Sequence, residues 1–530
     1  MDRKRNITVC VSWPYANNNL HIGYIASSLS GDILARYHRA LGDNVAMISG
    51  TDSHGTKPSI KARQQGCTPK DIVDKYDANF REALKKFEFS FDDFGITYDE
   101  FHKNEAKKIF KKLYDNGYLY EKVNSRPFCP HCNKFVNDTE IEIVCPVCGR
   151  TTKADNCDCG YVPNEADLVG AKCLVCGTKT EQRENKVLVF KLTAFKDFLQ
   201  KHLDDNKKYW RANSINETQK YLDDLRDRDF SRDLDWGVEI PLPGYEGKVV
   251  WVWWEALLGY ITGTMKYCAR TGQKFEDYWK TTSATDKRIY LCHAKDNIVF
   301  HSMFLPAMLE GLNDNWFIPD RMVSAEYLLI NDQKISKSNT KENVEALWWA
   351  NEYNTDTLRF YFCVNGPEKK DINFTSDLYK VCHNEIVNKL GNLVNRTLKY
   401  KGLEELPQAE VDAEILKKIK EAYTQIGTEI ENTEFKKAGS LLLDLVMEGN
   451  KYFDEQKPWV QLKEDKAGFD KTIATCALLI ANLGNLAEPF MPTTARTIRE
   501  LFGTGKAEWK PITSYGKVDL SKVTMLFTRI

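Results

Sequence analysis

The sequence lacks any long apolar run. Its most apolar stretch, Val249 to Ile261, contains Glu255 and is shorter than the about 18 apolar residues that a membrane-spanning helix needs. It also lacks a secretion signal, because the basic start is followed only by the short apolar segment Ile7 to Val11. From these two absences we expect a protein that has no membrane partner and works in the cytoplasm.

A net charge of either sign is missing as well. Lys and Arg (74) nearly cancel Asp and Glu (75), which leaves a net charge of −1. Composition therefore indicates no polyanionic partner, and any contact with nucleic acid must be local. Apolar residues make up 42 % of the chain, which excludes general disorder. With 530 residues, the chain is long enough for roughly three or four domains.

Two strand and helix patterns predict a parallel sheet. Alternating apolar residues at 7–11 and 45–49 indicate strands, and an amphipathic helix over about 21–40 connects them. A similar strand falls at 288–292, but a Cys-, Gly- and Pro-rich tract at 115–229 lies in between. β-α-β units build parallel sheets with ligand sites at the strand-to-helix turns. We therefore predict a sheet domain that an insertion splits in two.

The cysteines are unevenly distributed. Of 15 in the chain, eight form four close pairs, each separated by one or two residues. In a chain without a secretion signal, such pairs indicate metal ligands instead of disulfides, and two Cys-x-x-Cys knuckles complete one tetrahedral zinc site. Unpaired reduced thiols are the alternative. Because eight thiolates exceed what one ion can use, we predict two structural zinc ions, held by Cys129, Cys132, Cys145, Cys148, Cys157, Cys159, Cys173 and Cys176.

Two short motifs carry the chemistry of a nucleotide site. His21-Ile-Gly-Tyr24 falls where the first strand's turn enters its helix, so an imidazole and helix-terminal N–H groups could converge on phosphate. Lys334-Ile-Ser-Lys-Ser338 follows an apolar strand, and lysines on such a loop can neutralise charge that develops in a transition state. Each motif alone is weak, and an ordinary helix start or polar loop is the alternative. Flanking one split sheet, the two motifs together indicate a nucleoside triphosphate.

The pair is similar to the His-Ile-Gly-His and Lys-Met-Ser-Lys-Ser signatures of class I aminoacyl-tRNA synthetases. More segments resemble methionyl-tRNA synthetases in particular, and the likeness covers nearly the whole chain. These segments are Pro14-Tyr-Ala-Asn17, Asp52-Ser-His-Gly-Thr56, Arg232-Asp-Leu-Asp-Trp-Gly237, Val252-Trp-Trp-Glu-Ala256, Gly259-Tyr260, Lys295-Asp296, Phe300-His301, Asn388-Lys-Leu-Gly-Asn-Leu-Val-Asn-Arg396 and Pro458-Trp459.

The resemblance implies an ATP-dependent, AMP-forming methionine-tRNA ligase. Such an enzyme makes methionyl adenylate and pyrophosphate, then passes methionine to the 3'-terminal adenosine of a tRNA with a CAU anticodon. It further implies Mg bound with ATP and zinc sites that are nested, the second knuckle pairing with the third and the first with the fourth. The third knuckle, Cys157-Asp-Cys159, is one residue short, so we expect a distorted inner site.

The resemblance also assigns the site residues. Methionine would contact Tyr15, Asp52, Trp253, Tyr260 and His301; ATP would contact His21, Gly23, Tyr24, Asp296 and Lys337; and His21, Lys334 and Lys337 would act in catalysis. The anticodon would contact Asn392, Arg396 and Trp459. For Trp459 the alternative is a core anchor.

The motifs depart from the family pattern at two positions. Tyr24 replaces the usual second histidine, so it can donate a hydrogen bond but cannot carry imidazolium charge. Ile335 replaces the usual methionine, which is a change of similar volume.

In domain terms we predict an α/β catalytic domain with a Rossmann-type parallel sheet, split by a zinc-knuckle insertion and followed by an α-helical anticodon-binding bundle. The predicted bounds are 1–114 and 230–324 for the two catalytic halves, 115–229 for the insertion, 325–380 for the lysine-loop and stem-contact region, and 381–530 for the bundle. No appended dimerisation domain is evident, so we expect a monomer.

Three other functions fit parts of the sequence. A leucyl, isoleucyl, valyl or cysteinyl enzyme would share the class, but zinc knuckles fill the insertion in which the first three would need an editing domain. A catalytically inactive zinc-ribbon tRNA-binding protein would not exchange pyrophosphate into ATP. A small-molecule nucleotidyltransferase would leave the helical C-terminal third unexplained.

Overall fold

A computed structural model describes residues 4–137, 140–154, 157, 165–330, 333–334 and 343–530. At its centre is a five-stranded sheet in the order β14-β13-β1-β2-β3, in which all neighbours run parallel. The predicted split parallel sheet is confirmed, because three strands precede the insertion and two follow it. The strands are β1 (Asn6–Val11), β2 (Asn44–Thr51), β3 (Asp93–Ile96), β13 (Lys287–Ala294) and β14 (Arg321–Ala325).

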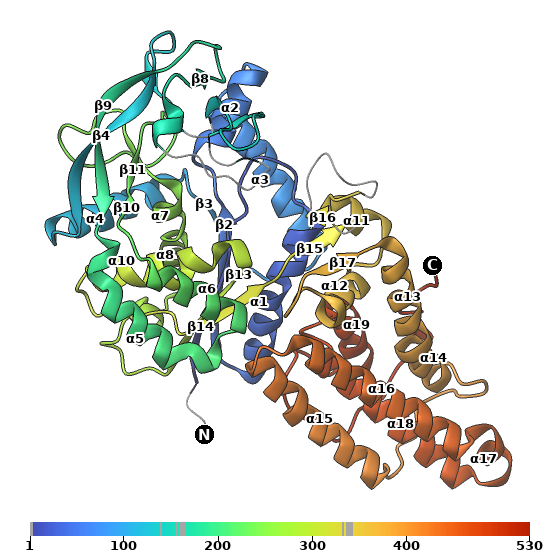
Figure 1. Cartoon of the computed structure of the whole chain (residues 1–530). Coiled ribbons are helices and arrows are strands. Elements are labelled where there is room, and N and C mark those ends of the chain that lie inside the picture. The colour runs from blue at the N-terminus through green and yellow to red at the C-terminus, as the bar shows by residue number, and fades with distance from the viewer. Residues whose placement is uncertain (1–3, 138–139, 155–156, 158–164, 331–332, 335–342) are drawn as a thin grey trace.

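Helix α1 (Ile22–Leu41) follows the first strand and is buried over most of its length. His21 caps its N-terminus, and Gly42 ends it with φ of 90°, a left-handed conformation that glycine adopts without strain. Figure 1 shows α1 between the sheet and the C-terminal helices. The other helices of the sheet domain are α2 (Thr56–Gln65), α3 (Pro69–Lys86), α4 (Glu100–Asp115), α7 (Val252–Ala256), α8 (Gly259–Thr271), α9 (Glu276–Trp279) and α10 (Leu305–Gly311), with a 3-10 turn at Lys295–Asn297 and a π-helical turn at Phe300–Phe304.

The insertion forms two small antiparallel sheets at the end of the molecule away from the C-terminal helices (Figure 1). One sheet is built on the long pair β4 (Leu119–Cys129) and β9 (Glu181–Phe190), with β5 (Lys134–Phe135) and β10 (Arg228–Asp229) at its edges. The second is made of β6 (Ile141–Val144), β7 (Thr151–Lys153) and β8 (Lys172–Cys173). Further elements are α5 (Lys196–Asn206), α6 (Ala212–Asp223), and the paired strands β11 (Ser231–Arg232) and β12 (Val249–Val250).

Helices dominate after residue 380, as predicted, and helices also lie within 346–365. A wide π-helical turn at Val387–Gly391 joins the helices over Ser376–Ile386 and Asn392–Leu398 into one helical stretch. A three-stranded sheet of β15 (Leu328–Ile330), β16 (Gln333–Lys334) and β17 (Ile372–Phe374) leads into these helices. The helices are α11 (Ala346–Glu352), α12 (Thr355–Asn365), α13 (Ser376–Ile386), α14 (Asn392–Leu398), α15 (Ala413–Glu431), α16 (Phe435–Gln456), α17 (Pro458–Glu464), α18 (Lys466–Leu486) and α19 (Pro492–Phe502).

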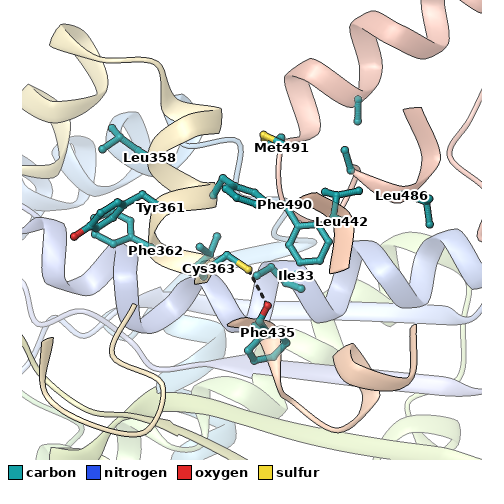
Figure 2. Packing of buried hydrophobic residues seen from close by; sticks show 14 of the residues in the cluster. Ile33, Leu358, Tyr361, Phe362, Cys363, Phe435, Leu442, Leu486, Phe490 and Met491 are labelled. Atoms are coloured by element: carbon teal, nitrogen blue, oxygen red, sulfur yellow. Dashed lines mark hydrogen bonds between the residues drawn. The ribbon is translucent and has the colours of Figure 1, made fainter. Parts of the chain in front are cut away.

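One continuous core joins the sheet domain to the helical bundle. Ile33 of α1, Leu358 of α12, Leu442 of α16 and Leu486 of α18 belong to the same buried cluster, and Figure 2 shows α1, α12 and the bundle helices meeting there. Burial of apolar surface between them stabilises one fixed arrangement of the two regions.

A buried ion pair lies in the same interface. The Arg359 guanidinium on α12 contacts the Asp32 carboxylate on α1 at 2.6 Å, and both side chains are fully buried. Arg359 also donates to the carbonyl oxygens of Phe87, Pro489 and Phe490. Burial opposes ionisation of Asp32, but Arg36 and Arg359 outweigh it and hold the pKa of this carboxyl well below its usual range. The orientation of the bundle therefore depends on this pair as well as on apolar packing.

Within the part of the chain that is described, no helix combines the length and the apolar character that crossing a membrane requires.

Candidate active site

A cavity of about 740 Å³ opens at the carboxyl ends of the parallel strands. Tyr15 follows β1, Asp52 follows β2, and Asp296 follows β13. Ligand sites in open α/β sheets form at this edge because the loops after parallel strands converge there. Of the residues predicted to contact methionine or ATP, all but Lys337 line this one cavity: Tyr15, His21, Gly23, Tyr24, Asp52, Trp253, Tyr260, Asp296 and His301.

The Asp52 carboxylate is the electrostatic centre of the cavity. Its side chain is 6 % exposed, and its Oδ1 has no hydrogen-bond partner among the described residues. Burial raises the pKa of Asp52 well above its ordinary value, and the negative charge of Glu255 adds to this effect. The group does accept a hydrogen bond from the His54 backbone N–H, but a buried carboxylate with one oxygen left without a partner is costly unless a cation pairs with it. This position therefore suits a ligand that carries an ammonium group.

Aromatic and imidazole rings form the apolar part of the cavity. The Tyr260 hydroxyl lies 2.8 Å from His301 Nε2, and His301 Nδ1 lies 2.8 Å from the Asn297 carbonyl oxygen. His301 must therefore donate through Nδ1 and accept at Nε2, which is a neutral tautomer. Burial lowers the pKa of His301 to about 4. Trp253 stacks on Phe300 with ring centroids 4.0 Å apart. Such rings suit a polarizable thioether.

His21 and Tyr24 lie at the start of α1. The His21 Nδ1 accepts a hydrogen bond from the Tyr24 backbone N–H at 3.1 Å, and the His21 side chain is exposed. The Tyr24 hydroxyl donates to the Ser12 carbonyl oxygen at 2.8 Å, and burial raises the pKa of Tyr24 to about 12. The exposed His21 ring can contact a ligand, whereas the hydroxyl hydrogen of Tyr24 is already engaged in a hydrogen bond to the main chain.

The lysine motif falls mostly outside the described residues. The backbone of Lys334 belongs to β16, whereas Lys337 is not described. Asp296 lines the cavity from the turn after β13. The catalytic roles assigned to both lysines stay predictions.

Sequence reasoning missed a buried cluster behind Asp52. The Glu255 carboxylate is fully buried and lies 2.6 Å from His54 Nδ1 and 3.2 Å from His102 Nε2. Burial opposes ionisation of Glu255, but the two imidazoles outweigh it and lower its pKa. The signal was visible, because Glu255 is the acidic residue that interrupts the most apolar run of the chain.

The insertion also contributes to the cavity, which the sequence did not predict. Phe135, Val136 and Asn137, next to the zinc-knuckle region, line it together with Arg126 of β4. The cavity is therefore closed by the insertion as well as by the sheet.

The cysteine pairs form two candidate metal sites. Cys129, Cys132, Cys173 and Cys176 place their sulfur atoms within 4.8 Å of one another, and Cys145, Cys148 and Cys157 do the same. This grouping follows the predicted nesting; Cys159 lies outside the described residues. Four converging thiols match the ligand set of a structural zinc ion. The Cys132 backbone N–H also donates to Cys129 Sγ at 3.4 Å, which favours the thiolate that zinc requires.

The predicted anticodon residues surround the C-terminal half of α16. The Asn392 Nδ2 donates to Asn450 Oδ1 at 3.4 Å, and Arg396 pairs with Asp454. Trp459 is the second residue of α17, directly after Pro458, and is 46 % exposed. These side chains are accessible in the structure.

Comparison with known proteins agrees with this geometry. A sequence profile described as "tRNA synthetases class I (M)" matches residues 7–398, and one for the "anticodon binding domain of methionyl tRNA ligase" matches residues 405–522. The split parallel sheet and the first match define the class of protein as a class I tRNA synthetase.

Relatives that match over the whole chain identify the family within this class. The chain is 37 % identical to methionine–tRNA ligase 1 of Alkaliphilus oremlandii, over 99 % of this chain and 97 % of that protein. It is 38 % identical to methionine–tRNA ligase of Bacillus mycoides, over 98 % and 96 % of the two chains. The fold matches Mycobacterium tuberculosis methionyl-tRNA synthetase in complex with methionyl-adenylate, with a TM-score of 0.81, 23 % identity, and 99 % and 100 % of the chains covered. The chain belongs to the methionine–tRNA ligase family.

Proposed function

We propose that this protein is a methionine–tRNA ligase that activates methionine with ATP and then charges a tRNA. The observation that carries the proposal is the buried Asp52 carboxylate, whose Oδ1 has no hydrogen-bond partner among the described residues, in the same cavity as Trp253, Tyr260 and His301. Methionine fits both parts of this cavity, because its ammonium group would pair with Asp52 and its thioether would pack against the rings.

The first step is adenylate formation. An oxygen of the methionine carboxylate attacks the α-phosphorus of ATP, a new O–P bond forms, the bond to the bridging oxygen breaks, and pyrophosphate leaves. Such displacements need mainly positioning and charge stabilisation. The exposed His21 at the start of α1 would stabilise the phosphate, together with Lys334 and Lys337. Mg bound with ATP would supply further positive charge.

In the second step, a hydroxyl of the 3'-terminal adenosine attacks the methionyl carbonyl carbon, and AMP leaves. The neutral tautomer of His301, fixed by Asn297 and Tyr260, keeps the thioether site free of positive charge. Discrimination between methionine and smaller apolar amino acids would then depend on contacts with the rings.

Zinc and tRNA complete the proposal. We assign one structural zinc ion to Cys129, Cys132, Cys173 and Cys176, and a second to Cys145, Cys148 and Cys157 together with Cys159. The accessible Asn392, Arg396 and Trp459 would contact the CAU anticodon, since amides, guanidinium groups and indoles read and stack on unpaired bases. The exposure of Trp459 argues against a core anchor. We further expect a monomer in the cytoplasm.

Methionine-dependent exchange of pyrophosphate into ATP tests the first step, and charging of tRNA with a CAU anticodon tests the second. We expect both to occur. Metal analysis after dialysis should find about two zinc ions per chain. Exchange driven by another amino acid and not by methionine would contradict the proposal.

A further inference from the structure

The loop that carries Asp52 and the helix that carries Trp253 are joined by one buried acid. Glu255 lies on α7, two residues after Trp253, and His54 lies two residues after Asp52. The bond between His54 Nδ1 and Glu255 Oε1, at 2.6 Å, connects residues 201 apart in sequence. The two walls of the amino-acid cavity are therefore held together through Glu255.

Both oxygens of the Glu255 carboxylate are held by imidazole rings. His102 Nε2 lies 3.2 Å from Glu255 Oε2, and His102 Nδ1 lies 2.9 Å from the Thr262 hydroxyl. One N–H from each ring donates to the carboxylate, and the Thr262 hydroxyl, which also donates to the Gly259 carbonyl oxygen at 3.4 Å, contacts the remaining nitrogen of His102. These contacts hold both oxygens of Glu255, and its lowered pKa keeps it negatively charged.

This charge acts on the ammonium subsite. Glu255 is the charged group that most strongly disfavours ionisation of Asp52, and it also acts on the neighbouring Tyr15 hydroxyl. Both carboxylates are buried, where charges interact more strongly than in water. Two neighbouring carboxylates that repel one another would both be stabilised by one bound cation.

We infer that Glu255 supplies a second negative charge to the ammonium subsite, behind Asp52, and that His54 and His102 hold it there. Glu255 does not touch the ligand in this arrangement, so it is a supporting residue whose field strengthens the selection of ligands with an α-ammonium group. The inference rests on the proposed function, since it takes methionine as the ligand.

Two thioether alcohols that differ only in the ammonium group test this inference. In both, a neutral alcohol replaces the carboxylate of methionine. L-methioninol keeps the ammonium, and 4-(methylthio)butan-1-ol lacks it; calorimetry on each protein gives both affinities. In Glu255→Gln, which keeps the shape and removes the charge, we expect the affinity for L-methioninol to fall about tenfold and that for the thioether alcohol to change less than about twofold. Because both ligands are measured on one preparation, an inactive fraction does not alter their ratio.

The matched control is Glu488→Gln, which removes a partly buried charge that pairs with Arg36 of α1 and Arg499 of α19. It should leave the ratio of the two affinities unchanged. Equal loss of both affinities in Glu255→Gln, or no loss, would overturn the inference and assign Glu255 a packing role.

If Glu255→Gln fails to fold, Glu255→Asp keeps the charge and decides the question. In this variant, the ratio of the affinities for L-methioninol and the thioether alcohol should stay within about threefold of the wild-type ratio. A larger fall of this ratio despite the retained charge would overturn the inference. Failure of the wild-type protein to bind L-methioninol would instead contradict the proposed substrate.

Discussion

The amino-acid cavity and the exposed end of the helical bundle hold their polar side chains in different ways. In the cavity, Tyr260 and His301 are buried and fixed by hydrogen bonds to protein groups. On the bundle, Asn392 and Arg396 contact side chains on α16, and Trp459 is half exposed.

The difference suits the sizes of the proposed ligands. A small amino acid must be enclosed, so folding itself arranges the groups that contact it, and little reorganisation remains for binding. A loop of RNA can meet exposed side chains that exchange weak surface contacts for contacts with bases. The comparison therefore predicts that breaking a buried ion pair has a larger effect than a change at the exposed end of the bundle.

The largest expected effect concerns the ion pair that connects the sheet domain to the helical bundle. Arg359→Met should lower the free energy of unfolding by about 3 kcal/mol or more, because it leaves the buried Asp32 with one cation fewer. Chemical denaturation measures this value. The double variant Asp32→Asn with Arg359→Met should recover part of the loss; an additive loss would mean that the pair does not couple the regions.

Next comes Lys337→Ala, which removes the charge proposed to act on the transition state. Adenylate formation should slow by about 10² or more, with methionine binding nearly intact. Pyrophosphate exchange measures the rate of adenylate formation, and calorimetry measures the affinity for methionine. A change limited to the KM for methionine would contradict the assigned role.

A smaller effect is expected at the bundle. Trp459→Ala should raise the KM for tRNA about tenfold, since stacking on one base is worth about 1 to 3 kcal/mol, while tRNA-independent pyrophosphate exchange stays close to wild type. Val460→Ala, a change at the neighbouring exposed position of α17, is the matched control. Equal loss of both activities with a lower Tm would assign Trp459 to the fold.

The smallest effect is a pH dependence of stability. Because burial and Glu255 raise the pKa of Asp52, the folded protein retains a proton that the unfolded chain releases near about pH 4. This contribution to stability is present below that pH and is lost as pH rises through the folded pKa. Without methionine, Asp52→Asn should therefore exceed the wild-type Tm by more at about pH 8 than at about pH 5. Thermal melts at the two pH values check this, and a constant difference would contradict it.

Much of the fold could be predicted from local patterns. The strands at 7–11, 45–49 and 288–292 became β1, β2 and β13, and paired cysteines marked the insertion. The spacing of apolar residues and of metal ligands is a local property, so it can be read without knowing the tertiary structure. The resemblance assigned the cavity residues, whereas the predicted domain bounds remain untested.

Other features depend on contacts between distant segments. The insertion's contribution to the cavity arises only once β4 and the residues around Val136 fold over the sheet. No spacing rule in the sequence indicates such a contact.

The sequence by itself determined the parallel sheet, its insertion, the helical C-terminal region and the chemistry of the individual motifs, because these follow from short-range patterns of apolar, cysteine and basic residues. Only the tertiary structure decided that Glu255 meets His54 and His102, and that Arg359 meets Asp32 across 327 residues of chain. Buried charges find their partners through packing, since a charge in a protein interior is stable only where folding brings a complementary group to it.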